Sequence, residues 1–181
     1  MNEGLIPRRY AKALYEVALE RHADARLYDL MKTLSASFES QPELNEVLSN
    51  PYITDADKSV LLTTASGAEA GDGLFKDFLK LLSKNRRMDM ARGIALAYVE
   101  LYRESNRIYE VNVTSASPMS RDENDRLYKM IERHLKGGTM EFTHTVDPSL
   151  IGGFTVSVGN ERIDASVSNE LKQLRLNLIT K

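Results

Sequence analysis

The chain has 181 residues and a net charge of −2, from 24 Lys and Arg against 26 Asp and Glu. This even balance argues against a non-specific nucleic-acid binder, because neutralising phosphates requires a basic surface. The sequence contains no cysteine, which excludes disulfides, thiol catalysis and Cys-ligated metal centres. No apolar run reaches the roughly 18–20 residues of a transmembrane helix, and residues 1–9 lack the apolar stretch of a secretory signal. We therefore expect a soluble protein of a reducing compartment such as the bacterial cytoplasm.

Helical periodicity runs through almost all of residues 1–105. Pro7 suits the first turn of a helix, where its missing N–H would have no partner. Thr54 followed by Asp57 is a pattern typical of a helix N-cap. Six helices joined by short loops are predicted, and together they predict a compact bundle without strands. They cover roughly 7–20, 27–38, 44–48, 55–65, 74–83 and 88–105.

Two of these helices, the first and the fifth, offer more apolar surface than one packing face needs. At 100° per residue their apolar arcs are about 240° and about 160° wide, against the ~100° of a usual stripe. If the two helices lie side by side, their outer edges form a groove suited to an amphipathic helix of a partner. The alternative interpretation is that both arcs are buried in the core of the bundle. The edge residues are Tyr10, Ala13 and Val17 on the first helix and Leu74, Phe78 and Leu81 on the fifth.

After Asn106 the apolar residues take the alternating spacing of strands. Ser120 and Glu123 form the pattern of a capping box at the start of a single helix. Strands are predicted over 109–113, 142–146, 154–158 and 162–165. A last helix carries a narrow seam typical of a helix that meets another helix, made of Val167, Leu171, Leu174 and Leu178. The predicted fold is mainly α, with an N-terminal six-helix bundle over residues 1–105 and a small α+β C-terminal domain over residues 106–181.

Motifs that carry chemistry are absent from the sequence. It has neither a G-x-x-x-x-G-K-[ST] phosphate loop nor a G-x-G-x-x-G turn. His22, His134 and His144 lie too far apart in the sequence to form a metal-binding pair on one helix. We predict no catalytic, cofactor-binding or metal-binding residue, and hence no enzyme. Two other functions stay open on the residues alone: a helical regulatory or nucleic-acid-binding module with Arg86-Arg87 as a phosphate contact, and a small enzyme without a recognisable motif.

Several sequence blocks occur in a characteristic order over nearly the whole chain. They are RRYAKALYEVA at 8–18, Asn50-Pro51, FLKLL at 78–82 leading to NRRM at 85–88, DPSLIGGF at 147–154, and IDASV at 163–167, followed by Leu171 and Leu174. In sequence and spacing these blocks resemble the delta subunit of F-type ATP synthases, the family that includes the mitochondrial oligomycin-sensitivity-conferring protein. Ala165 departs from the pattern, because the family commonly has Gly at that position.

The resemblance implies a non-catalytic stator subunit of a proton-translocating F-type ATP synthase. Such a subunit links the alpha/beta catalytic head to the b subunit of the peripheral stalk, so that rotor torque drives ATP synthesis. In the family, the N-terminal domain takes the N-terminal helix of an alpha subunit between its first and fifth helices. The C-terminal domain meets the C-terminal region of the b subunit.

The resemblance also implies where the chain acts and which residues bind. It implies no cofactor, no nucleic acid, no direct membrane insertion, and a monomer within a larger hetero-complex. The expected location is peripheral, on the cytoplasmic face of the bacterial inner membrane. Combined with the apolar arcs, it places the groove for the alpha subunit at Tyr10, Ala13, Leu14, Val17, Leu74, Phe78, Leu81 and Leu82. The residues expected to contact the b subunit are Leu171, Leu174 and Leu178.

Overall fold

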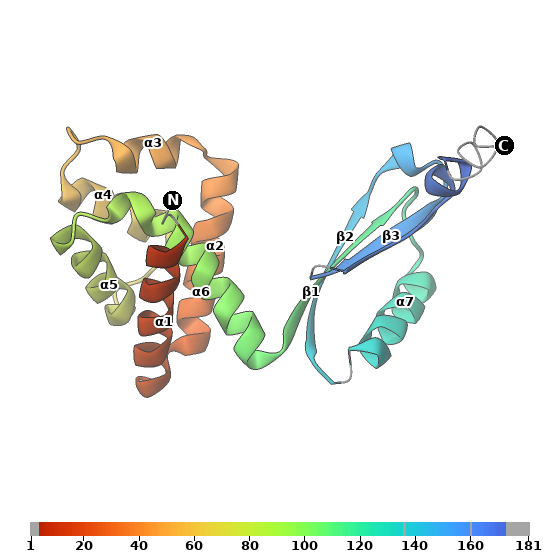
Figure 1. Cartoon of the computed structure of the whole chain (residues 1–181), viewed down its shortest axis with the longest axis horizontal. Helices are drawn as coiled ribbons and strands as arrows, with labels where there is room; N and C mark the ends of the chain where they lie inside the picture. The colour runs from red at the N-terminus through yellow and green to blue at the C-terminus, as the bar shows by residue number, and fades with distance from the viewer. Residues whose placement is uncertain (1–3, 136, 160, 173–181) are drawn as a thin grey trace. The chain divides into compact units, whose positions relative to one another are not determined.

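The structure is a computed structural model that describes residues 4–135, 137–159 and 161–172. The chain divides into two compact units, residues 1–105 and residues 106–181 (Figure 1). The first is entirely helical in its described part, and the second combines helices with a four-stranded sheet. The chain is therefore mainly helical with one small sheet, as the sequence predicts.

The first unit is built from α-helices and one 3₁₀ helix. These are α1 (Leu5–Glu20), α2 (Asp24–Ser40), α3 (Glu43–Ser49), α4 (Asp55–Ser66), α5 (Gly73–Lys84), η1 (Met88–Met90) and α6 (Ala91–Asn106). The segment predicted as one helix over 88–105 divides in the structure into the 3₁₀ helix η1 and the helix α6, so the unit has a short 3₁₀ helix in addition to the six predicted helices. Such a short helix has too few residues to show a period.

Local signals that end and begin helices operate as the sequence predicts. The Thr54 side chain accepts a hydrogen bond from the backbone N–H of Asp57, which satisfies one free donor at the start of α4. Gly67 ends the same helix with a left-handed backbone (φ 68°), a conformation that glycine adopts without a steric penalty. Both ends of α4 therefore carry a local signal, the cap at Thr54 and the glycine at 67.

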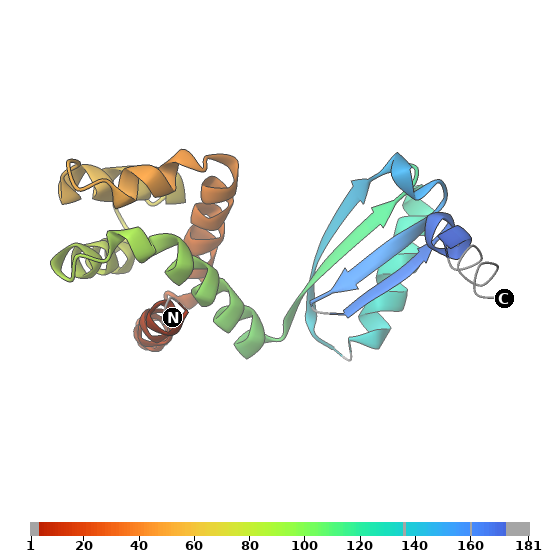
Figure 2. The same cartoon turned by 45° about the horizontal axis from the view of Figure 1, so that its top comes forward.

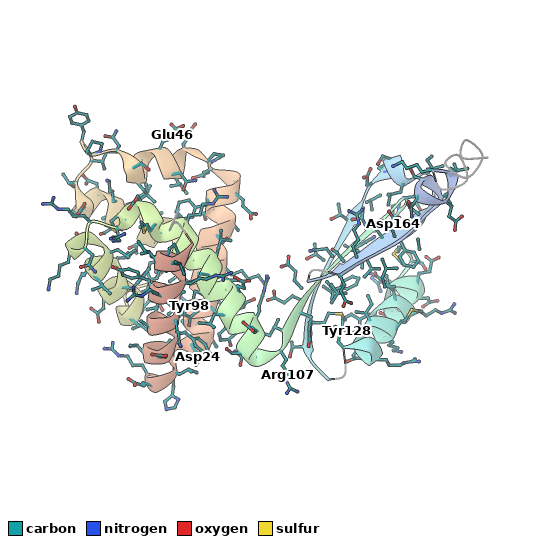
Figure 3. The ribbon with its side chains drawn as sticks, viewed as in Figure 1. Asp24, Glu46, Tyr98, Arg107, Tyr128 and Asp164 are labelled. Carbon is teal, nitrogen blue, oxygen red and sulfur yellow. The ribbon has the colours of Figure 1, made fainter. Side chains whose placement is uncertain are left out.

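The core of the first unit gathers apolar side chains from all its helices. Tyr98 of α6 is fully buried, and its hydroxyl donates a 3.3 Å hydrogen bond to the carbonyl oxygen of Asp24 (Figure 3). Burial raises the pKa of Tyr98, because the phenolate would lose its hydration. Tyr28 and Tyr102 stack beside it with ring centroids 4.3 Å apart. These aromatic contacts hold α6 against α2.

The second unit is a twisted sheet covered on one face by a helix (Figure 2). The sheet order is β2-β1-β3-β4, with β1 and β2 parallel and the other neighbours antiparallel. Helix α7 connects the two parallel strands, as parallel pairing requires. The elements are β1 (Ile108–Ser115), α7 (Arg121–His134), β2 (Thr139–Val146), the 3₁₀ helix η2 (Pro148–Leu150), β3 (Gly153–Val158) and β4 (Glu161–Ser166). Residues 167–172 are helical.

Two features of the second unit bear on the sequence predictions. The capping box at Ser120 and Glu123 is confirmed, with both reciprocal hydrogen bonds present. Ala165 lies within β4, paired with Phe154, and its backbone φ is not positive. The close approach falls instead on Gly153, whose φ is +76° and where any Cβ would run into the carbonyl oxygen of Ala165. The chain can therefore carry alanine at 165 while it needs glycine at 153.

Candidate partner-binding groove between helices α1 and α5

A surface depression of about 470 Å³ lies where the sequence predicts a groove between α1 and α5. On α1 its lining repeats at helical spacing, so one edge of the helix forms one wall. Ala13 is exposed at the C-terminal end of this wall, and its small side chain allows another backbone to approach closely. The lining residues are Ile6, Arg9, Tyr10, Ala13, Leu81 and Arg87.

The eight predicted groove residues separate into a surface set and a buried set. Tyr10, Ala13 and Leu81 line the depression, whereas Val17 and Leu74 are half-buried and do not line it. The prediction is wrong for Leu14, Phe78 and Leu82 as surface contacts. They are 8%, 3% and 0% exposed and belong to the core of the unit. The wide apolar arcs are thus mostly core, and only their outer edge is left for a partner.

Polar contacts hold α1 and α5 together at two points along the pair. Asn85 Nδ2 donates a 2.9 Å hydrogen bond to the Tyr10 hydroxyl near the start of α1. Arg21, just after α1, forms an ion pair of 3.6 Å with Asp77 of α5. The early part of α1 therefore meets the end of α5, which makes the two helices antiparallel. Ala13 and Leu81 lie in the stretch between these contacts.

Three groove residues were missed by the sequence reasoning: Ile6, Arg9 and Arg87. For two of them a signal was available, since Ile6 and Arg9 lie four residues before Tyr10 and Ala13 and so share their side of the helix. Arg87 follows α5 in a turn, where helical spacing gives no information. Arg9 and Arg87 place two positive charges around an apolar strip, and the groove therefore favours a partner that carries carboxylates.

The predicted contact residues of the second unit are described only in part. Leu171 is 51% exposed, and Val167, at the start of the same helical stretch, is 38% exposed. Leu174 and Leu178 lie outside the described residues. The described start of the seam is therefore exposed.

One Ser–His pair in the second unit resembles the nucleophile and base of a catalytic site, but its hydrogen bonds do not suit that role. His144 Nε2 lies 2.8 Å from Ser115 Oγ, and Ser115 Oγ also donates a 2.6 Å hydrogen bond to the carbonyl oxygen of Ser117. Because the single hydroxyl proton is used there, the imidazole must donate to Ser115 and cannot act as its base. The buried serine therefore ties the end of β1 to β2.

The chain is a two-unit protein, with a helical unit that carries a partly apolar surface depression and a small α+β unit. Comparisons with known proteins give its family. The family model described as ATP synthase delta (OSCP) subunit matches residues 6–178. The ATP synthase subunit delta of Parabacteroides distasonis is 37% identical over 179 residues, covering 99% of this chain and 98% of its own. That of Bacteroides thetaiotaomicron is 36% identical over 182 residues, covering 100% and 97%.

The fold agrees with a solved structure of the same kind of complex. A chain in the cryo-EM structure of the Toxoplasma gondii mitochondrial ATP synthase hexamer superposes with a TM-score of 0.71 at 19% identity, covering 96% of this chain and 97% of that one. The present chain belongs to the ATP synthase delta (OSCP) subunit family. It is accordingly a non-catalytic stator subunit of the ATP synthase peripheral stalk.

Proposed function

We propose that the groove between α1 and α5 holds the N-terminal helix of an alpha subunit, and that the second unit holds the C-terminal region of the b subunit. The observation that carries this proposal is the apolar depression of about 470 Å³ between the two tied helices. Through these two contacts the chain would connect the catalytic head to the stalk.

The groove combines an exposed apolar side chain with positive charges at its edge, two features that suit an amphipathic helix. Leu81, one of its lining residues, is 46% exposed, and each large apolar anchor buried against such a surface contributes roughly 1.5–3 kcal/mol. The contacts Tyr10–Asn85 and Arg21–Asp77 hold the walls before a partner arrives, which lowers the ordering cost of binding. Arg9 and Arg87 favour a partner helix with acidic residues at its edges.

For the second unit we propose that the b subunit contacts three residues of the seam, Leu171, Leu174 and Leu178, of which the structure describes Leu171. The exposed side chain of Leu171 supports this assignment. A matched test compares Leu171→Asp with Met130→Asp, since Met130 is also exposed but lies on α7. We expect only Leu171→Asp to weaken binding of a fragment from the C-terminal end of the b subunit. Equal binding by both variants would remove the seam from the proposal.

The mechanical role follows from two contacts made at once. The rotor would drag the head along unless the head were tied to a fixed part of the complex. A subunit whose role is to hold two others together must stay bound under torque, so a slow dissociation rate matters more than a fast association rate.

None of the described helices has the length and apolar character needed to span a membrane. We propose a peripheral position in the complex, as a single copy, on the cytoplasmic face of the bacterial inner membrane.

The groove is tested with two leucines that differ in position and hardly in exposure. Leu81 in the groove is 46% exposed, and Leu96 on α6 is 44% exposed. We expect Leu81→Asp to weaken binding of a peptide from the N-terminus of the alpha subunit by about tenfold or more, because an anchor is lost. Leu96→Asp should leave the titration calorimetry unchanged. Undiminished binding by Leu81→Asp, with an intact helical circular dichroism spectrum, would contradict the proposal.

A further inference from the structure

An exposed isoleucine of the second unit lies at a turn where the backbone is strained. Ile151 directly follows η2 with φ 66° and ψ −39°, a conformation that residues other than glycine rarely adopt and that is least suited to a β-branched side chain. Its side chain is 69% exposed, so burial within the chain offsets little of this cost. The fold thus keeps a large apolar side chain in solvent at a position where glycine would be less strained.

Hydrogen bonds within the turn determine how Ile151 is presented. The Ile151 N–H donates a 3.1 Å hydrogen bond to the carbonyl oxygen of Pro148. At the start of the turn, Asp147 Oδ1 accepts a 2.9 Å hydrogen bond from the N–H of Ser149. Bonds of the chain itself therefore hold the turn, which lowers the ordering cost of a contact made there.

Gly152, the next residue, connects this turn to the start of the seam. Its carbonyl oxygen accepts a 3.0 Å hydrogen bond from the N–H of Val167, and a Cβ at Gly152 would lie 3.0 Å from Val167 Cγ2. Val167 and Leu171 are four residues apart in one helical stretch, and therefore lie on the same side of it. They are 38% and 51% exposed. Exposed apolar surface thus runs from Leu171 through Val167 to the turn that carries Ile151.

The same turn carries a negative charge. Hydrogen bonds from Ser149 lower the pKa of Asp147, because they favour the ionised carboxylate. Among the residues that the structure describes, this carboxylate forms no ion pair with a lysine or an arginine. A partner that has a basic residue beside an apolar face would complement both the carboxylate and the isoleucine.

We infer that the surface for the C-terminal region of the b subunit extends beyond the seam to Ile151 and Asp147, and that it takes an amphipathic helix with a basic residue at the edge of its apolar face. Ile151 packs against the apolar face, and the basic residue pairs with Asp147. Binding then removes from water an apolar side chain that the strained turn holds outward. This inference rests on the proposed binding of the b subunit to the second unit.

A matched pair of serine substitutions in the full chain tests the apolar contact. Ile151→Ser removes a side chain that is 69% exposed, and Met130→Ser removes one on α7 that is 66% exposed. We expect Ile151→Ser to raise the Kd for a fragment from the C-terminal end of the b subunit about tenfold, because an apolar anchor is lost. Met130→Ser should leave the Kd unchanged.

The charge is tested by Asp147→Asn. Asparagine keeps an oxygen that can accept the bond from Ser149 but removes the negative charge. We expect the Kd for the same fragment to rise severalfold and to depend less on salt concentration than it does in the unaltered chain.

The strain is tested without a partner. Ile151→Gly should leave the melting temperature of the full chain unchanged or raise it, since relief of the strain offsets the freedom that glycine adds to the unfolded chain. A clear fall in the melting temperature would show that the isoleucine is already packed against the chain itself, and would overturn the inference.

The binding results separate this inference from the proposal on which it rests. If Leu171→Asp weakens binding of the fragment while Ile151→Ser or Asp147→Asn binds it as the unaltered chain does, the inference is overturned and the proposed seam stands. If Leu171→Asp and Ile151→Ser both bind the fragment as the unaltered chain does, the proposed function of the second unit fails together with the inference.

Discussion

Asn85 Nδ2 donates a 2.9 Å hydrogen bond to the Tyr10 hydroxyl, and this bond joins the first helix to the residue that follows the fifth. These residues are 75 positions apart in the sequence. Together with the Arg21–Asp77 ion pair, the bond connects the two walls of the groove above their shared core. The two exposed contacts thus join the outer edges of walls whose buried sides belong to one core.

The Tyr10–Asn85 bond should matter more for binding than for folding. Asn85→Ala removes an exposed hydrogen bond, so we expect a loss of at most about 1 kcal/mol in the free energy of unfolding. Affinity for the peptide of the alpha subunit should fall severalfold, because the walls are less well ordered. A double-mutant cycle with Tyr10→Phe measures the bond itself. Additive effects of the two substitutions on peptide affinity would mean that the bond does not order the groove.

Core and surface members of the predicted groove should behave differently. Leu14→Ala leaves a cavity in the core and should cost about 2–5 kcal/mol of unfolding free energy in urea. Leu81→Ala, at a side chain 46% exposed, should cost well under half of that, yet weaken the peptide complex more than any loss of stability explains. A small effect of Leu14→Ala on unfolding would contradict its assignment to the core.

The pair Arg26–Asp72 should make stability depend on pH at the acid end. Arg26 Nε and Nη2 donate hydrogen bonds of 3.0 and 2.9 Å to the two oxygens of Asp72. These bonds, and one from the backbone N–H of Glu69, lower the pKa of Asp72 from its ordinary 3.8. Because the folded carboxyl binds its proton less readily than the unfolded one, the stabilisation is complete above the unfolded pKa and is lost as pH falls through the folded pKa.

Arg26→Met tests this dependence by urea unfolding at several pH values. The stability difference between Arg26→Met and the unaltered chain should be largest near neutral pH and shrink towards zero in acid. Arg92→Met, which removes an exposed charge on α6, is the control and should show no such convergence. A difference that stays constant down to about pH 3 would rule out the protonation of Asp72 as its cause.

Alanine substitutions at two glycines with positive φ, Gly153 and Gly159, should distinguish the cost of a steric clash from the cost of backbone strain. Gly153 (φ +76°) and Gly159 (φ +54°) both adopt the left-handed conformation, but only at Gly153 would a Cβ meet other backbone. Gly159→Ala should cost about 1 kcal/mol from strain. Gly153→Ala should cost about 3 kcal/mol or more, because β3 and β4 must move apart. Hydrogen exchange of the sheet amides measures both, and equal losses of protection would refute the clash.

Local and periodic features of this protein could be predicted from its residues. The caps at Thr54 and Ser120 are bonds between groups three positions apart, so the pattern and the structure coincide. Helices and strands follow from apolar periods that repeat over several turns or pleats. The 3₁₀ helices η1 and η2 span three residues each, too few for any period, so η2 was missed and η1 was predicted only as the first residues of a helix over 88–105.

The amino-acid order already contained the mainly helical first part, the change to strand spacing after Asn106 and the family blocks, since all of these depend on neighbours along the chain. It also indicated that the first and fifth helices had apolar surface to share. Which part of that surface is buried required the packed structure: Leu14, Phe78 and Leu82 became core, and Tyr10, Ala13 and Leu81 stayed at the edge. The spacing of apolar residues shows which side of a helix is apolar. How much of that side is buried depends on the other helices that pack against it.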